Sequence, residues 1–545
     1  MNQESTQGSE NSAHDQAQPN RRTAIKNLVG GVAAVGLLGK MHTSIAQTAS
    51  ATGSTSVPSS GATQIIDMPA WELSVQIHAK KVSCQEVMKA YLTQIDKVND
   101  KVNAIVALQD HDDLMKQAAE KDRLLAQGKT DGWMHGFPQA IKDLDDTKGV
   151  RTTYGSPVFK DNVPTSDSFM VQRMKAAGII VVGKTNTPEW GYGSHTYNPV
   201  YGVTGNAYDP SKSAGGSSGG AAVTLALRMQ PVADGSDFMG SLRNPAGWNN
   251  VFGYRPSWGR VPAPGKELFF NQFGINGPMG SSVADVALLL NTQSGYTPLA
   301  PESLADDANL KALTPLNVCD RLKMDPKGKS IAWLGDWHGY LAMEKDVLEV
   351  CQNGLKAFEG MGVKVDEIDN PTDPAKFWDE VWLPHRHICA SSMRALMEDP
   401  AKRALSKPEA IWEYEGSKKY SAQDTYFASL RRSDWYRTVL GIFEKYDFIA
   451  VPTAQMFAFD KNWHWPKEVA GKEMDTYHRW MEIVTHWTMC GCPVAAIPVG
   501  FNSKGLSMGI QLIGKPQSDW DVLRMAYAYE LATDIVRKHR PALAG

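Results

Sequence analysis

The sequence is poor in cysteine, with six in 545 residues. No pair has C-x-x-C spacing, and the one C-x-C pair, Cys490 and Cys492, stands in an apolar stretch. Disulfide frameworks and zinc sites depend on closely patterned cysteine or histidine residues. The sequence therefore predicts neither a disulfide framework nor a metal site, and we interpret the cysteines as packing residues. The six are Cys84, Cys319, Cys351, Cys389, Cys490 and Cys492.

Neither sign of charge dominates the sequence. Lysine and arginine number 56 against 59 aspartate and glutamate, which gives a net charge of −3. Because nucleic-acid binding rests on a basic field, no nucleic-acid partner is expected. A composition with 42% hydrophobic and 21% charged residues is typical of a globular chain with an ample core.

Long hydrophobic runs are also lacking near the N-terminus. The apolar stretch at residues 28–38 has eleven residues and is interrupted by Gly30, Gly31 and Gly36. A transmembrane helix needs about 20 apolar residues to cross a hydrocarbon core of about 30 Å. We therefore expect no stable membrane span here.

The same stretch is preceded by a pair of arginines, Arg21 and Arg22. Paired arginines before a weakly apolar, glycine-containing run resemble a twin-arginine export signal, which we assign to residues 1–46. Residues 47–63, rich in Ser, Thr, Ala and Gly, are interpreted as a flexible linker. The resemblance implies a periplasmic or secreted protein. The alternative is a tail with a chance arginine pair on a cytoplasmic protein.

Two serines 24 residues apart are the most informative feature of the sequence. Ser217 lies in Ser213-Ala-Gly-Gly-Ser-Ser-Gly-Gly220, and Ser241 lies in Gly240-Ser-Leu-Arg-Asn-Pro-Ala246. Upstream, Lys142 follows a short apolar run that begins at Phe137. A serine hydroxyl needs a base to remove its proton, and a lysine kept neutral by burial can be that base. The pattern indicates an amide-hydrolysing enzyme.

These motifs resemble the amidase signature family. Residues 178–186, GIIVVGKTN, are similar to its strand and GKTN turn, and residues 491–501 and 509–514 are similar to its last core strands. The resemblance implies an α/β fold in a single large domain, with a mixed central β-sheet flanked by helices. We assign this domain to residues 64–545. Residues 135–260 form its catalytic signature block, and residues 300–480 form a variable substrate-shaping region.

The resemblance also implies roles for individual residues. Ser241 is the nucleophile, and Lys142 and Ser217 form a proton relay to it, with a cis peptide bond before Ser217. The remaining roles are an oxyanion hole made by backbone amides, a border of the acyl pocket, and support of the two loops. They fall on Phe238, Met239, Gly240 and Ser241 for the oxyanion hole, on Gly191 for the substrate pocket, and on Asp237, Arg243, Gly215 and Gly216 for support.

One residue departs from the family pattern inside the proposed oxyanion hole. Met239 stands where relatives usually have glycine. If this position requires a positive φ, methionine costs about 1–2 kcal/mol there. If φ is negative, its side chain narrows the pocket instead.

Local patterns predict three helices around these motifs. Ser83 and Glu86 have the spacing of a capping box, and apolar residues from Val87 onward then share one helical face. Residues 112–126 predict a more polar surface helix. Residues 219–229 predict a buried helix that begins directly at the serine loop.

The substrate-shaping region is rich in aromatic residues, most of which we interpret as core. Some of them are expected to line an apolar pocket, which favours a bulky or apolar acyl or aryl group. The expected substrate is a small-molecule non-peptide amide, with a cyclic amide or a carbamate as open alternatives. No cofactor is expected, and monomer and homodimer both remain open.

Two other functions stay open on the same resemblance. One is an amidotransferase A-type subunit that works with partner subunits, against which the leader argues. The other is a non-catalytic binding protein on the same scaffold, against which Lys142, Ser217 and Ser241 argue. Gly215–Gly219 also fits the G-x-S-x-G nucleophile elbow, but a turn rather than a hydrophobic strand precedes it. His385 and His387 have no supporting ligands for a metal site.

Overall fold

The computed structural model describes residues 62–270 and 272–545, which form one compact unit. The predicted export signal (1–46) and all but the last two residues of the predicted linker (47–63) lie outside the described residues. No helix among the described residues is long and apolar enough to cross a membrane.

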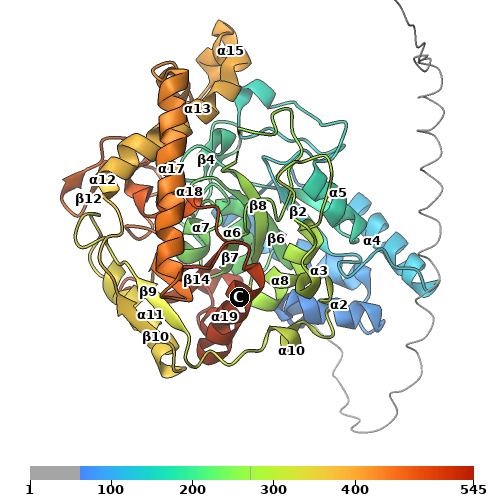
Figure 1. Ribbon diagram of the computed structural model, residues 1–545. Coiled ribbons are helices and arrows are strands. Elements are labelled where there is room, and N and C mark those ends of the chain that lie inside the picture. The colour runs from blue at the N-terminus through green and yellow to red at the C-terminus, as the bar shows by residue number, and fades with distance from the viewer. Residues whose placement is uncertain (1–61, 271) are drawn as a thin grey trace, which may run out of the picture. The chain divides into compact units, whose positions relative to one another are not determined.

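A mixed sheet of eight strands forms the centre of the molecule (Figure 1). Its order is β10 (Lys364–Glu367), β9 (Ser330–Trp333), β11 (Phe448–Pro452), β15 (Ser507–Ile513), β14 (Val494–Phe501), β7 (Phe252–Arg255), β8 (Ile275–Gly280) and β6 (Val232–Asp237). The first three strands are parallel, and every later pair is antiparallel. β14 and β15 are almost completely buried, as their apolar residues predict.

A three-stranded sheet lies next to β6, in the order β1 (Ile105–Val106), β3 (Ile180–Thr185) and β2 (Pro138–Lys142). β2 is not paired with β6 in a sheet. Instead, backbone N–H groups of β2 donate hydrogen bonds to side chains at and just before the start of β6. The backbone N–H of Ala140 donates to Gln230 Oε1 at 2.8 Å, and that of Lys142 donates to Asp234 Oδ2 at 3.0 Å. Because buried N–H groups need acceptors, these contacts hold the end of β2 against β6.

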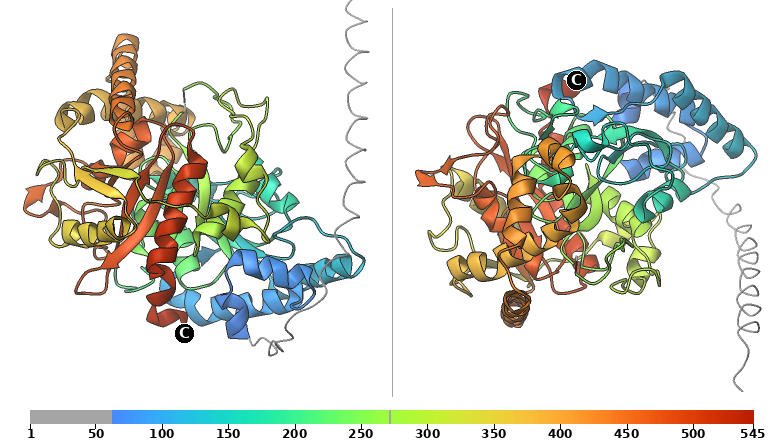
Figure 2. Two further views of the ribbon diagram at one scale, coloured as in Figure 1. Left: turned by 60° about the horizontal axis from the view of Figure 1, so that its bottom comes forward. Right: turned by 90° about the horizontal axis from the view of Figure 1, so that it is seen from above.

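Helices flank the sheets (Figures 1 and 2). α8 and α19 pack on each other and on the sheet, and α17 projects from the body of the molecule in the left view of Figure 2. The longer or functionally placed helices are α2 (Ala70–His78), α3 (Cys84–Val102), α4 (His111–Ala126), α5 (Phe169–Ala176), α6 (Gly219–Ala226), α7 (Asn244–Trp248), α8 (Val283–Gln293), α11 (Val347–Gly360), α13 (Leu383–Cys389), α16 (Pro408–Ser417), α17 (Ala422–Phe443), α18 (Thr485–Met489) and α19 (Asp519–Thr533).

The three local helix predictions are confirmed, except that the third helix ends at Ala226 and not at residue 229. Ser83 and Glu86 form the expected capping box at the start of α3, whose apolar face is buried. α4 buries only three of its side chains, and α6 is buried along nearly all of its length. All six cysteines are free thiols, and four of them are buried.

Candidate active site

Lys142 is the last residue of β2 and is fully buried. Its Nζ lies 2.8 Å from the Oγ atoms of both Ser217 and Ser218 and 2.9 Å from that of Ser236. Burial lowers the pKa of Lys142 to about 7, although nearby carboxyl groups, including that of Asp145, act in the opposite direction. A large fraction of the lysine is therefore neutral near pH 7 and able to accept a proton.

Ser217 and Ser218, the two adjacent serines that are hydrogen-bonded to Lys142, have different surroundings. Ser218 Oγ donates to the backbone oxygen of Ser236 at 3.3 Å and accepts from the backbone N–H of Ser236 at 3.4 Å. Ser217, in contrast, lines a pocket together with Ser241. The peptide bond between Gly216 and Ser217 is cis, as the resemblance implied.

Glycine is required at the turn before these serines. Gly215 has φ +75°, and a Cβ on it would lie 2.5 Å from Asn244 Oδ1. Gly216 has no positive φ, but a Cβ there would lie 2.9 Å from the backbone nitrogen of His195. The first glycine is therefore needed for both its conformation and its small size, and the second for its small size.

Ser241 follows β6 in the loop that leads to α7, and its backbone oxygen accepts from the N–H of Ser218 at 3.3 Å. Ser241 is only 6% exposed, and among the described residues its hydroxyl has no hydrogen-bond partner. Ser217 and Ser241 thus face one pocket without a direct hydrogen bond between their hydroxyl groups. Catalytic hydrogen bonds in unliganded enzymes are often long and shorten when substrate binds.

A buried ion-pair network fixes the loop that carries Ser241. Arg243 donates to both carboxylate oxygens of Asp237, at 2.8 and 2.9 Å, and to Gln511 Oε1 at 2.7 Å. Arg255, which the sequence analysis did not single out, also pairs with Asp237. Burial raises the pKa of Asp237, but the two arginines outweigh burial and hold this pKa well below its usual range.

The same carboxylate also contacts the loop of the expected oxyanion hole. Asp237 accepts from the backbone N–H groups of Gly240, at 2.9 Å, and Leu242, at 3.0 Å. The amide of Gly240 therefore donates within its own loop, and its role as an oxyanion donor stays a prediction. Within the described chain, no acceptor contacts the backbone N–H groups of Phe238, Met239 and Ser241, so these three stay available.

Met239 does not have a positive φ. The positive φ in this loop, +82°, belongs to Gly240. Methionine therefore carries no left-handed strain here. Its side chain is 7% exposed and lines the pocket beside Phe238, so it narrows the space in front of Ser241.

The pocket in front of Ser241 has a volume of about 250 Å³. Gly191 lies on its wall, and a Cβ on Gly191 would lie 3.4 Å from Ser217 Oγ. From residues 300–480 the pocket receives Arg386, Cys389, Ala390, Ser392 and Tyr477. Tyr477 is the one aromatic residue of that region on the wall, and most of its tryptophans are buried in the core. Trp190, Tyr192 and Phe238 supply the other aromatic surfaces.

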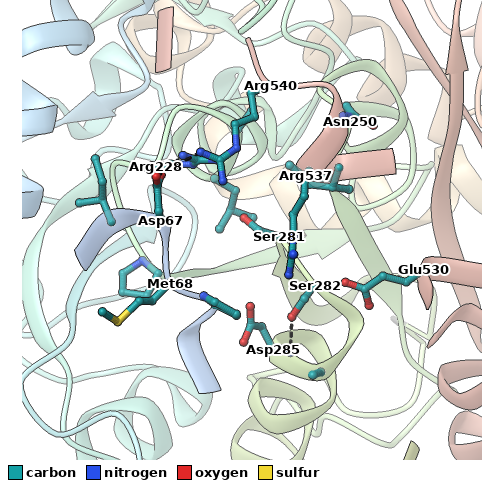
Figure 3. Close-up of a pocket in the computed structure, with 18 of the residues that line it drawn as sticks. Asp67, Met68, Arg228, Asn250, Ser281, Ser282, Asp285, Glu530, Arg537 and Arg540 are labelled. Atoms are coloured by element: carbon teal, nitrogen blue, oxygen red, sulfur yellow. Dashed lines mark hydrogen bonds and ion pairs between the residues drawn. The ribbon is translucent and has the colours of Figure 1, made fainter. Parts of the chain in front are cut away.

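A larger pocket, of about 330 Å³, lies elsewhere and shares no residue with this one (Figure 3). Asp67 pairs there with Arg228 and Arg540, and burial raises the pKa of Asp285 to about 6 and of Glu530 to about 8. None of the described residues that line it is a lysine or a histidine. It therefore lacks the hydroxyl–lysine arrangement found at Ser217.

The protein combines a mixed α/β fold with a buried, partly neutral lysine that is hydrogen-bonded to serine hydroxyl groups. This combination defines a class of hydrolases that act on amides. Comparison with known families agrees, because the model described as Amidase matches residues 86–523. The chain belongs to the amidase signature family. The family and the fold predicted from the sequence are both confirmed.

Individual relatives illustrate the range of this family. An acylamidase of Rhodococcus erythropolis is 31% identical over 471 residues, which are 85% of this chain and 95% of that protein. The A subunit of the glutamyl-tRNA(Gln) amidotransferase of Thermosynechococcus vestitus is 31% identical over 491 residues, covering 85% of this chain and 97% of that one. The crystal structure of a bacterial aryl acylamidase has a TM-score of 0.79 at 27% identity, covering 88% of this chain and 98% of that chain.

Proposed function

We propose that this protein is an amidase that hydrolyses the C–N bond of a non-peptide amide through an acyl-enzyme on Ser241. One observation carries the proposal. The buried Lys142, whose pKa is lowered to about 7, lies 2.8 Å from Ser217, and Ser217 shares a pocket with Ser241. The two named acylamidase relatives support an amide as the substrate.

The geometry supports a relay of two proton transfers. Neutral Lys142 takes the proton of Ser217 while Ser217 takes that of Ser241, and Ser241 Oγ attacks the amide carbonyl carbon. The carbonyl π electrons move to the oxygen, and we expect the backbone N–H groups of Phe238, Met239 and Ser241, which have no backbone acceptor among the described residues, to donate to it. Loss of one such donor typically costs about 10²- to 10³-fold in kcat.

The relay then runs in the opposite direction. Lys142 returns its proton through Ser217 to the leaving nitrogen, the C–N bond breaks, and the amine departs. Water, deprotonated by the same relay, attacks the acyl ester and regenerates Ser241. No step requires an electron acceptor or donor.

The experiment that tests this function is a panel of amides incubated with the purified protein, with release of amine or ammonia as the readout. The panel contains anilides, linear aliphatic amides, a cyclic amide, a carbamate, a C-terminal peptide amide and glutamine. Release from a simple amide supports the proposal and identifies the class. Release from glutamine alone would favour the second candidate, an amidotransferase A-type subunit, which the named relative of Thermosynechococcus supports. Binding of the amides without release of amine or ammonia would favour a non-catalytic binding protein.

The activity is expected to rise with pH up to about pH 7 and to level off above it, because Lys142 has a pKa of about 7. Protonated lysine cannot accept a proton, so kcat/KM should fall about tenfold for each pH unit below that value. None of the described residues that line the pocket is a histidine that could produce the same limb. The measurement is kcat/KM from pH 5 to 9. A profile that is flat or that falls above pH 7 would contradict neutral Lys142 as the base.

We also propose that residues 1–46 direct export of the folded enzyme by the twin-arginine route. Replacement of both Arg21 and Arg22 by lysine should move the protein from the periplasmic fraction to the cytoplasmic fraction of an expressing bacterium. The unchanged chain and a cytoplasmic marker enzyme are the controls. Equal periplasmic amounts of both chains would exclude a twin-arginine signal.

A further inference from the structure

Arg386, on α13, lies on the wall of the catalytic pocket and takes no part in the proton relay. Its Nε donates to Glu413 Oε1 at 2.7 Å, and its Nη2 donates to the hydroxyl of Tyr477 at 3.2 Å. Glu413 belongs to α16 and is fully buried. Two of the five N–H groups of the guanidinium are thus used by the protein.

Two aromatic rings pack against this guanidinium. Its Cζ lies 4.6 Å from the ring centre of Tyr192 and 4.7 Å from that of Phe238. Both distances are within the range of cation–π attraction. Because both rings line the pocket and Phe238 directly follows β6 in the oxyanion loop, Arg386 is held close to the reacting centre.

The other N–H groups of Arg386 have no acceptor among the described residues, although the side chain is only 11% exposed. Arg386 is also the only cationic side chain among the described residues that line the pocket. Donors that are shielded from bulk water and left without a protein acceptor require a partner from the contents of the pocket.

The charge of the site indicates which kind of partner fits. Glu413 already balances the charge of Arg386, and Asp237 is paired with Arg243 and Arg255. A substrate carboxylate would add a charge that no free cation on the described pocket wall matches, and burying such a charge is costly. A neutral oxygen acceptor satisfies the donors without that cost.

We propose that Arg386 is a substrate-binding residue that selects amides with a second, neutral oxygen acceptor, such as a ketone, ether or second amide oxygen. This inference rests on the proposed function, because it concerns the same pocket. A site built to hydrogen-bond a substrate group discriminates against analogues that lack the group, since its donors then stay unpaired. A hydrogen bond to a charged group corresponds to roughly 10- to 100-fold in affinity.

Matched ligands test the selection. On the amine side, the pair is the 4-acetyl and 4-isopropyl derivatives of acetanilide, which differ little in shape. On the acyl side, the pair is the anilides of 5-oxohexanoic and hexanoic acid. The anilide of glutaric acid, which ends in a carboxylate, serves as the anionic comparison. Dissociation constants are measured calorimetrically on Ser241→Ala protein, and kcat/KM is measured on the wild type.

The variant that removes the proposed donor is Arg386→Met combined with Glu413→Gln, because it leaves no buried charge unpaired. Arg479→Met is the matched control, since Arg479 pairs with Asp475 and Glu482 and does not line the pocket. Circular dichroism and Tm establish that each variant is folded. Arg386→Lys, which keeps the charge, is measured if the double variant does not fold.

In Ser241→Ala protein that retains Arg386, we expect the ketone of at least one pair to bind about 10- to 100-fold more tightly than its apolar partner. The double variant should lose this preference and still bind the apolar partner, whereas Arg479→Met should keep the preference. A preference that survives in the folded double variant, an absent preference in both pairs, or tighter binding of the carboxylate would overturn the inference. A kcat/KM that does not depend on Ser241 would instead count against the proposed function.

Discussion

Replacement of Ser241 by alanine should lower kcat/KM by about 10⁴-fold or more for whichever amide the wild type hydrolyses. The reason is that no acyl-enzyme can form without the Oγ atom that faces the pocket. Stability should change little, because this hydroxyl has no hydrogen-bond partner among the described residues. Steady-state amine release and Tm are the two measurements.

A buried serine remote from the pocket provides the matched control. Ser74, on α2, is fully buried and donates to the backbone oxygen of Trp133 at 2.6 Å. Ser74→Ala should lower the free energy of unfolding by about 1 kcal/mol and leave kcat/KM unchanged. Equal activity of Ser241→Ala and wild type would mean that another group is the nucleophile.

Replacement of Lys142 by methionine should have an effect of similar size, with kcat reduced by about 10⁴-fold. Methionine fills nearly the same buried volume but cannot accept a proton. The limb of the pH profile near pH 7 should disappear from any residual activity, because Lys142 is the group that produces it. Initial rates from pH 5 to 9 check both expectations.

Lys142→Arg separates the role of a base from that of a positive charge. Arginine keeps the charge but stays protonated at every accessible pH, since its pKa exceeds about 12. If Lys142 acts as a base, the folded arginine variant is as inactive as the methionine variant. Substantial activity of Lys142→Arg would show that the charge alone is sufficient.

The parts of the site that could be predicted from the sequence are those encoded by short, local patterns. The glycine-rich segment around Ser217 and the spacing to Ser241 were sufficient to indicate the family. Capping at Ser83 and Glu86 was predictable because both partners lie within one helical turn. The strands near residues 180 and 494 were predictable because they are continuous apolar runs.

The remainder depends on contacts between residues far apart in sequence. Ser236 is hydrogen-bonded to Lys142 because β6 passes beside the end of β2. Arg255 forms an ion pair with Asp237 because β7 and β6 both pair with β8. Neither residue belongs to a motif. The hydrogen bond from the amide of Gly240 to Asp237 likewise follows from where the carboxylate of Asp237 points, which composition does not determine.

The expectation for the aromatic region shows the same limit. Aromatic side chains pack in cores and line pockets with equal ease, so their abundance in residues 300–480 could not tell which ones reach the substrate pocket. Tyr477 does so, while Trp378 and Trp382 are buried in the core. The more informative residue of that region, Arg386, stands between two histidines and belongs to no motif.

The most direct test of Ser241 as the nucleophile is rapid-quench mass spectrometry of the enzyme during turnover of the best amide from the panel. Quenching in acid preserves an acyl ester, and peptide mapping then locates it. The proposed mechanism predicts an adduct of the acyl mass on the peptide that contains Ser241, formed before steady-state release and absent from Ser241→Ala. An adduct on Ser217 or on any other residue would contradict it.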